Sequence, residues 1–296
     1  MTATSFSPAE LAVIRRAFAC QIMAAAGITD TRLEAALAAV PRETFLGEPP
    51  WQIAEPRGGY RTLAAVNPVY AYQDALFVLA ADKGIHNGSP ALHARLLAAL
   101  EPQLGDRVVH VGAGTGYYSA VLAELVGPAG HVYAVEIDDA LASRARNALA
   151  DRNNITVLAA DGAQLEKQAA DAVYVNFGVA RPADVWIEAL RPGGRLVMPL
   201  GVPGPARRSR GRHSSYGAAL RIERRSESFS ARWLGPAFFV CATGQLATDA
   251  DQLDALTAAF TRGGVEFVKS MIWKAVPPIE RCWYVSKDWA LCYDEV

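Results

Sequence analysis

The sequence predicts an α/β fold in which a mostly parallel sheet carries helices on both faces. Residues 105–138 read as an apolar strand, a turn with three glycines, an amphipathic helix and a second apolar strand that ends in an acidic residue. A helix is expected from Pro90 to Leu100, and from there to about residue 201 strand-type and helix-type segments alternate. Because such alternation is typical of parallel sheets, we expect ligands to bind beyond the carboxyl ends of the strands.

Two helices are expected before this region. Residues 8–39 are rich in Ala and Leu with charged residues interspersed, and Gly27 interrupts the pattern. Thr29 or Asp30 can cap the second helix. Residues 46–70 are rich in Pro and Gly and have loop composition.

The glycine turn is the most specific motif. Gly112 and Gly114 let the backbone turn tightly and approach a ligand without an intervening Cβ, and Gly116 permits close packing where the helix leaves the strand. Glu136 stands at the predicted end of the second strand, where a carboxylate can accept both hydroxyl hydrogens of a ribose. The unit therefore predicts a ligand with an adenosine-like sugar.

The spacing of the glycines distinguishes two cofactor classes. A dinucleotide-binding turn reads Gly-x-Gly-x-x-Gly, whereas the third glycine here arrives one residue early, at Gly116. The shorter form resembles motif I of the class I S-adenosylmethionine-dependent methyltransferases, as does its place about a hundred residues into the chain. This resemblance implies a Rossmann-like sheet and S-adenosyl-L-methionine as cofactor.

Later segments continue the same pattern in order. A short strand ends in Asp161-Gly162, where these enzymes commonly hold the adenine amino group, and a fourth strand ends at Asn176. Leu190–Gly201 supplies a glycine turn and a fifth strand. The residues expected to bind the cofactor are Gly112, Ala113, Gly114, Gly116, Glu136, Ile137, Asp161, Gly162 and Asn176.

Within that superfamily, the chain most resembles the protein-L-isoaspartate O-methyltransferases. The resemblance covers roughly residues 30–201 and is carried by Val40-Pro41-Arg42, by Pro90-Ala-Leu-His93-Ala94 and by Leu190–Gly201. It implies transfer of a methyl group to the carboxylate of an aspartate or isoaspartate in a protein or modified peptide. A carboxylate is ionised at neutral pH, because its reference pKa is near ~4, and needs no general base.

The chain departs from the family pattern at the acceptor side. The family has a catalytic serine in a Thr-Ile-Ser-x-Pro segment, and an ungapped alignment places Gly88 on it, with Ser89 one residue late. Either the loop shifts and Ser89 takes the role, or the acceptor chemistry has changed. The expected catalytic residues are those of this turn, namely Ser89, Asn87 and His86. A second departure is His110, where an acid usually precedes the first glycine by two residues.

Other functions stay open at this point. One is a small-molecule O- or N-methyltransferase of secondary metabolism, with His86 or His93 as base. Another is a catalytically silent cofactor-binding module. Adenine methylation of nucleic acid is disfavoured, because the Asn/Asp-Pro-Pro-aromatic turn of those enzymes is replaced by Asn176-Phe-Gly-Val and the net charge is only −1.

The amino-acid composition leads to expectations about the core, the location of the protein and the state of its cysteines. Apolar residues make up 51% of the 296-residue chain, enough for a sizeable core, yet no apolar run reaches the about eighteen residues of a spanning helix. With no basic-then-apolar segment at the amino terminus, we expect a cytoplasmic protein. The four cysteines show no metal-ligand spacing, so we expect free buried thiols and no metal. The oligomeric state stays open.

The expected domains are an N-terminal helical and loop region (1–88), a cofactor-binding Rossmann-like domain (89–201) and a C-terminal α+β extension (202–296). In the extension we expect two or three strands over Gly217–Cys241, a helix over Asp249–Arg262 and a pair of strands over Glu266–Tyr293, whose aromatics should be core. These elements either extend the sheet or form an appended α+β lobe. An Arg-rich stretch over residues 207–232 is read either as a solvated loop or as a surface for an acidic peptide.

Overall fold

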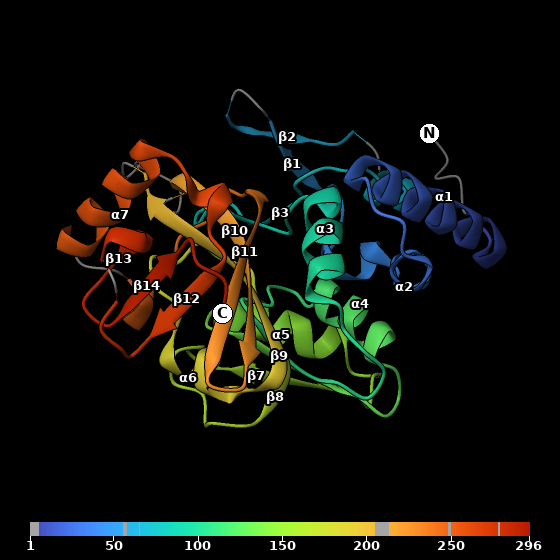
Figure 1. The fold of residues 1–296 in the computed structure, drawn as a ribbon. Helices are drawn as coiled ribbons and strands as arrows, with labels where there is room; N and C mark the ends of the chain where they lie inside the picture. Colours follow the sequence, from blue (N-terminus) through green and yellow to red (C-terminus); the bar gives the residue numbers. More distant parts are fainter. Residues whose placement is uncertain (1–5, 56–57, 65, 205–212, 248–249, 278) are drawn as a thin grey trace. The chain divides into compact units, whose positions relative to one another are not determined.

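The computed structural model describes residues 6–55, 58–64, 66–204, 213–247, 250–277 and 279–296. The chain divides into two compact units: unit 1 comprises residues 1–106 and 113–159, and unit 2 comprises residues 107–112 and 160–296 (Figure 1). The boundary falls within the glycine turn, between Gly112 and Ala113. The residues predicted to bind the cofactor are therefore divided between the units.

The amino-terminal helices of unit 1 form as the sequence predicts. Helix α1 (Pro8–Ala26) begins at Ser7, which makes a capping box, and ends at Gly27 in the left-handed conformation, with φ 68°. Helix α2 (Thr31–Ala39) begins at Asp30, whose carboxylate accepts two main-chain N–H groups. Helix α3 (Pro90–Leu100) packs against α1. The break at Gly27, the cap at Asp30 and the bounds of α3 confirm the predictions.

Short hairpins and a β-α-β segment complete unit 1. Strand β1 pairs antiparallel with β2, β3 pairs antiparallel with β4, and β6 pairs in parallel with β7. The first hairpin lies inside the segment whose composition indicates a loop, because strands of three residues leave no periodic signal. The bounds are β1 Gln52–Ala54, β2 Tyr60–Thr62, β3 Val78–Ala80, β4 Ile85–His86, α4 Tyr117–Val126, β6 His131–Glu136, α5 Asp139–Ala148 and β7 Ile155–Ala159, with 3-10 turns η1 Arg42–Phe45 and η2 Pro68–Ala71.

Unit 2 is built on a mixed sheet. Its strands follow the order β13-β14-β12-β11-β10-β9-β8-β5, in which β5, β8 and β9 are parallel and the remaining neighbours are antiparallel. The bounds are β5 Arg107–Val111, β8 Ala170–Val175, α6 Asp184–Ala189, β9 Leu190–Pro203, β10 Ser214–Arg225, β11 Ser228–Pro236, α7 Ala250–Arg262, β12 Ser270–Trp273, β13 Cys282–Val285 and β14 Trp289–Cys292, with 3-10 turns η3 Gly244–Leu246, η4 Val265–Phe267 and η5 Ile279–Arg281. The α/β class is thereby confirmed.

The carboxy-terminal part continues the sheet, which is one of the two arrangements that the sequence left open. Strand β9 runs across the expected boundary at residue 202 and pairs with β10. The described part of residues 266–293 holds β12, β13 and β14, where a pair of strands was expected. Trp283, Tyr284 and Trp289 are buried, which confirms that these three aromatics are core, whereas Trp273 and Tyr293 are only partly buried.

The Arg-rich stretch is described only in part. Arg207, Arg208, Arg210 and Arg212 lie outside the described residues. Of the arginines that follow, Arg221 and Arg225 both form ion pairs with Glu223, at 3.0 and 3.1 Å. These two arginines are therefore already paired with a carboxylate of the same chain.

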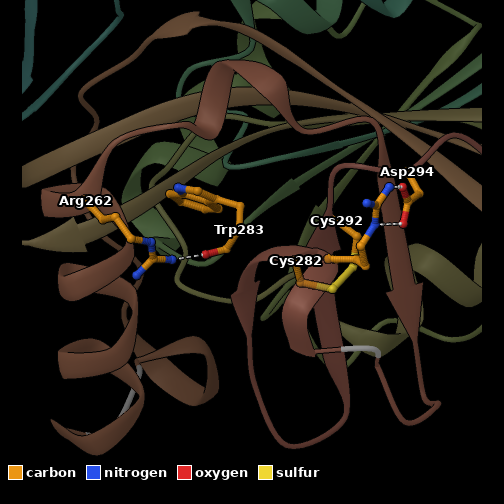
Figure 2. The surroundings of a disulfide bond; sticks show 6 residues. Arg262, Cys282, Trp283, Cys292 and Asp294 are labelled. Atoms are coloured by element: carbon orange, nitrogen blue, oxygen red, sulfur yellow. Dashed lines mark hydrogen bonds and ion pairs between the residues drawn. A yellow bond between two sulfur atoms is a disulfide. The ribbon is translucent and has the colours of Figure 1, made fainter.

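The expectation of free thiols is wrong for Cys282 and Cys292, which form a disulfide (Figure 2). The two residues are opposite one another in the register of β13 and β14. Pairing of this kind depends on strand register, which the ten-residue separation in sequence does not reveal. Cys20 and Cys241 lie outside this disulfide; Cys241 is buried as expected, whereas Cys20 is exposed, so the expectation of a buried thiol is wrong there.

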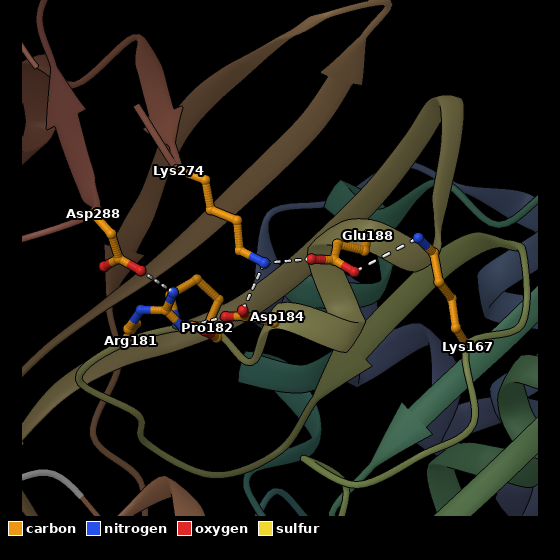
Figure 3. A network of polar contacts seen from close by, with 7 residues as sticks. All are labelled: Lys167, Arg181, Pro182, Asp184, Glu188, Lys274 and Asp288. Atoms are coloured by element: carbon orange, nitrogen blue, oxygen red, sulfur yellow. Dashed lines mark hydrogen bonds and ion pairs between the residues drawn. The ribbon is translucent and has the colours of Figure 1, made fainter. Parts of the chain in front are cut away.

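A network of ion pairs joins helix α6 and the segment before it to the residue after β12 and the residue before β14, all in unit 2 (Figure 3). Arg181 contacts Asp184 and Asp288 at 2.6 and 2.7 Å, and its guanidinium carbon lies 4.3 Å from the ring centroid of Trp273. Lys274 contacts Asp184 at 2.8 Å. Figure 3 also shows Lys274 and Lys167 on the two sides of Glu188. Because these groups are partly exposed, we assign the network a modest structural contribution.

The described part of the chain contains no helix that is both long and apolar enough to cross a membrane. Nor does it gather three or more His, Cys, Asp or Glu side chains that could hold a metal ion.

Candidate active site

The glycine turn requires glycine for separate reasons at its three positions. All three have positive φ, of 77°, 58° and 95° for Gly112, Gly114 and Gly116. A Cβ on Gly112 would lie 2.6 Å from Phe177 Cδ1, and one on Gly116 would lie 2.6 Å from Leu149 Cδ1. The Cβ of a residue at 114 would approach no atom closer than 3.5 Å. Conformation therefore fixes Gly114, whereas packing as well as conformation fixes the other two.

Glu136 closes this turn inside unit 1. Its Oε2 accepts the N–H of Gly114 at 2.7 Å, and its Oε1 accepts the N–H of Asp138 at 2.9 Å. The residue is 6% exposed, and burial raises the pKa of its carboxyl group while the two N–H donors oppose that rise. In the structure this carboxylate shapes the glycine turn, and its binding of a ribose stays a prediction. Ile137, beside it, is 48% exposed.

In unit 2, Asp161 and Gly162 follow one another in a tight turn. Asp161 Oδ1 accepts the N–H of Ala163 at 2.9 Å, and its Oδ2 accepts the N–H of Gln245 at 3.4 Å. A Cβ on Gly162 would lie 2.2 Å from Val111 Cγ1, so this glycine is required by its packing on β5. The Gly162 carbonyl also accepts the indole N–H of Trp186 at 2.8 Å.

His110 and Asn176 form a buried pair at the ends of β5 and β8. His110 is fully buried, and burial lowers its pKa to about 3. Asn176 Nδ2 lies 2.7 Å from His110 Nε2, and because an amide NH₂ can only donate, the neutral ring accepts. Asn176 Oδ1 is buried without a hydrogen-bond partner among the described residues. The position where the superfamily has an acid therefore carries a neutral ring that orients an amide.

The predicted catalytic turn, residues 86–89, is tied to unit 1 by its own side chains. His86 ends strand β4 and is half-buried. Asn87 is 9% exposed, and its Oδ1 accepts the N–H of Phe77 at 2.9 Å. Ser89 caps α3: its hydroxyl accepts the N–H of Leu92 at 3.3 Å and donates to Asp74 Oδ1 at 2.8 Å. The structure thus shows structural partners for Asn87 and Ser89, and their catalytic roles stay a prediction.

Gly88 leaves no space for the serine that the family places there. It has a φ of 74°, and a Cβ on it would lie 2.1 Å from His93 Nε2. The His93 ring is 2% exposed and stacks on Tyr118, with 3.8 Å between ring centroids and 13° between ring planes. The packing of His93 in this chain therefore leaves no space for a side chain at position 88.

Sequence reasoning left Tyr117 and Tyr118 without a role. Both follow Gly116 directly at the start of α4, and both hydroxyl groups are buried without a partner among the described residues. Burial raises the pKa of Tyr117 to about 12. The available signal was their position, because they begin the helix that directly follows the glycine turn.

The comparisons with known proteins agree with this geometry. Residues 15–213 match the family model described as protein-L-isoaspartate(D-aspartate) O-methyltransferase (PCMT). A protein-L-isoaspartate O-methyltransferase of Aeropyrum pernix is 38% identical over 181 residues, which cover 60% of this chain and 62% of that relative.

Two solved structures share the fold. A protein-L-isoaspartate O-methyltransferase has a TM-score of 0.63 at 22% identity, with 83% of this chain and 69% of that chain covered. A Plasmodium falciparum structure, a putative protein-L-isoaspartate O-methyltransferase in complex with S-adenosyl-L-homocysteine, has a TM-score of 0.57 at 16% identity, with 77% and 98% covered. Because the family model matches about two thirds of its length, this chain belongs to the protein-L-isoaspartate(D-aspartate) O-methyltransferase family.

Proposed function

We propose that this chain is an S-adenosylmethionine-dependent O-methyltransferase whose acceptor is the carboxylate of an aspartate or isoaspartate in a protein or modified peptide. The observation that carries the proposal is the glycine turn closed by Glu136, since Gly114 keeps its left-handed conformation with space beside it. Membership of the family supports the activity. The product-bound Plasmodium structure supports the cofactor.

The residues of each unit fit that cofactor chemically. In unit 1, each Glu136 oxygen accepts one main-chain N–H and retains lone-pair capacity for a ribose hydroxyl. In unit 2, Asn176 Oδ1 is a buried acceptor without a partner among the described residues, suited to an ammonium or amino group. When bound, the cofactor would supply an electrophilic methyl group on a sulfonium.

The residues near the candidate acceptor turn are better suited to orienting an acceptor than to removing a proton from it. A carboxylate acceptor needs no base, so the task of the protein is to orient it and exclude water. The Ser89 hydroxyl already donates to Asp74, and the His93 ring is buried in a stack. We therefore assign the turn at 86–89 a role in positioning the acceptor and assign no general base.

Two other functions are alternatives, and one observation bears on each of them. A hydroxyl or amine acceptor would need a base, and the burial of His93 argues against that residue. A catalytically silent cofactor-binding module is favoured by one observation, the filling of the side-chain space at Gly88.

The test is methyl transfer from labelled cofactor to an isoaspartyl peptide, with the matched aspartyl peptide beside it. We expect label that mild alkali releases, because methyl esters hydrolyse readily. Alkali-stable label on a metabolite would identify a small-molecule enzyme. Cofactor binding without transfer to any peptide would support the silent module and contradict the proposal.

A cytoplasmic location also stays a prediction. The Cys282–Cys292 disulfide bears against it, because disulfides are rare in cytosolic proteins. Fractionation of the native host, followed by thiol labelling of the protein, would decide between a cytoplasmic location and an oxidising compartment.

A further inference from the structure

We propose that Arg42 is a positioning residue that holds the candidate acceptor turn, residues 86–89, through the connecting segment, residues 71–77. The kinetic part of this proposal rests on the proposed function, because it assumes that the turn receives the acceptor. The structural part, that Arg42 holds the turn in place, does not rest on the proposed function. All the contacts involved lie within unit 1.

Arg42 holds the connecting segment by its main chain. The side chain is fully buried, and its Nη1 donates to the carbonyl oxygens of Ala71 and Gln73 at 2.9 and 2.5 Å. Its Nη2 donates to the carbonyl of Ala75 at 3.0 Å. Three alternate carbonyls of one segment therefore converge on one planar guanidinium, a geometry that the single ammonium of a lysine cannot reproduce.

Aromatic rings surround the same guanidinium. Its central carbon lies 5.5, 5.0 and 5.8 Å from the ring centroids of Phe18, Phe77 and Tyr117. Its hydrogen bonds among the described residues go to carbonyl oxygens and not to a carboxylate. Burial lowers the pKa of Arg42. A buried cation without a paired carboxylate is costly, so the specific geometry that it imposes is a better reason for its presence than stability.

The connecting segment in turn holds both ends of the candidate acceptor turn. Asp74 Oδ1 accepts the hydroxyl of Ser89 at 2.8 Å and the N–H of Ala91 at 3.2 Å. Phe77 and Asn87 exchange two hydrogen bonds, from Phe77 N to Asn87 Oδ1 at 2.9 Å and from Asn87 N to the Phe77 carbonyl at 3.0 Å. The contacts from Arg42 to Ser89 are thus continuous.

The turn η1 that contains Arg42 also reaches the glycine turn. The Phe45 carbonyl accepts the hydroxyl of Thr115 at 2.6 Å, and the Phe45 ring packs edge-on against Tyr117. Residues 42–45 therefore contact the connecting segment on one side and the residues around Gly116 on the other. This arrangement would fix the distance between the acceptor turn and the unit 1 part of the cofactor site.

The test uses Arg42→Lys and Asp74→Ala, with Arg32→Lys as the matched control. Arg32 also donates to two main-chain carbonyls of unit 1, those of Pro102 and Leu125, but it does not contact the connecting segment. Hydrogen–deuterium exchange is measured over residues 71–93 in each protein. Both test variants should lose about tenfold or more of their protection there, while Arg32→Lys should not.

Kinetics with the isoaspartyl peptide provide the second readout. Arg42→Lys should lower kcat/KM for the peptide by about tenfold or more, while the affinity for S-adenosylhomocysteine changes less than about twofold. The double variant with Asp74→Ala should lose little more than either single variant, because both act through one chain of contacts.

Three results would overturn the proposal: unchanged exchange over residues 71–93, additive losses in the double variant, or equal losses in Arg42→Lys and Arg32→Lys. If Arg42→Lys does not fold, Asp74→Ala alone must still show local exchange and the kinetic loss. If the wild-type chain transfers no methyl group to the peptide, the proposed function fails, and the exchange measurement still decides the role of Arg42.

Discussion

The Nε2 atom of His93 fills the space that a side chain at Gly88 would need. A Cβ at position 88 would lie 2.1 Å from that atom. The ring cannot move aside cheaply, because it is buried and stacked on Tyr118. The replacement of the family serine by glycine and the placement of His93 are therefore one feature of the chain.

We predict that Gly88→Ala lowers the free energy of unfolding by about 3 kcal/mol, through overpacking as well as backbone strain. Gly105→Ala is the control, because Gly105 also has positive φ, 85°, but a Cβ there meets no atom within 4 Å. Its cost should be about 1 kcal/mol. Urea unfolding measures both, and adding His93→Ala should recover part of the loss at position 88. Equal costs at the two glycines would contradict the packing argument.

Ser89→Ala should remove a helix cap and lower the free energy of unfolding by about 1 kcal/mol. Because its hydroxyl donates to Asp74 and accepts from Leu92, we expect kcat for methyl transfer to fall less than about tenfold. Ser89→Thr, which keeps a capping hydroxyl, should restore stability. A loss of kcat far beyond tenfold with stability restored would show that the Ser89 hydroxyl acts on the acceptor directly.

The buried His110 should make the fold sensitive to acid. Its pKa is about 3 in the folded chain, against a reference of about 6.5 when unfolded. Its stabilisation is complete above the unfolded value and is lost as pH falls from about 6.5 towards 3, because only the unfolded state binds the proton. Between about pH 7 and pH 5, the wild type should lose about 2 kcal/mol more than His110→Gln in urea unfolding. Parallel losses would show that His110 does not account for the sensitivity.

The disulfide gives a prediction that does not depend on function. Under non-reducing denaturation, thiol labelling should reach two of the four cysteines, and reduction should expose the other two. Replacing Cys282 and Cys292 by serine should lower the free energy of unfolding by about 2–3 kcal/mol, whereas Cys20→Ser should have little effect. Labelling of all four cysteines before reduction would contradict the bridge.

Local signals in the sequence predicted the elements well. Ser and Asp caps, the glycine after α1 and the proline that begins α3 act within a few residues, so the bounds at Gly27, Asp30 and Pro90 could be predicted. The apolar runs also predicted β5, β6, β7 and β8; β5 and β8 are buried parallel strands, which are continuously apolar, whereas β7 is only partly buried.

Contacts between distant residues could not be predicted in the same way. The Cys282–Cys292 bridge depends on the register of β13 and β14, and four-residue strands give too few positions to fix a register. The packing of His93 on Gly88 and the three carbonyls bound by Arg42 likewise arise only from tertiary structure. For the candidate site, the sequence predicted which segments matter, and tertiary contacts show what holds them.

We expect the glycine turn closed by Glu136 to bind S-adenosylmethionine, and titration calorimetry with the product S-adenosylhomocysteine tests this binding most directly. We predict saturable heat with the wild type and affinity lower by about tenfold or more in Glu136→Gln, because one amide oxygen cannot replace two carboxylate oxygens. Glu124→Gln, in α4, should bind as the wild type does. Absence of heat with the wild type, or binding of a nicotinamide dinucleotide in its place, would contradict the account.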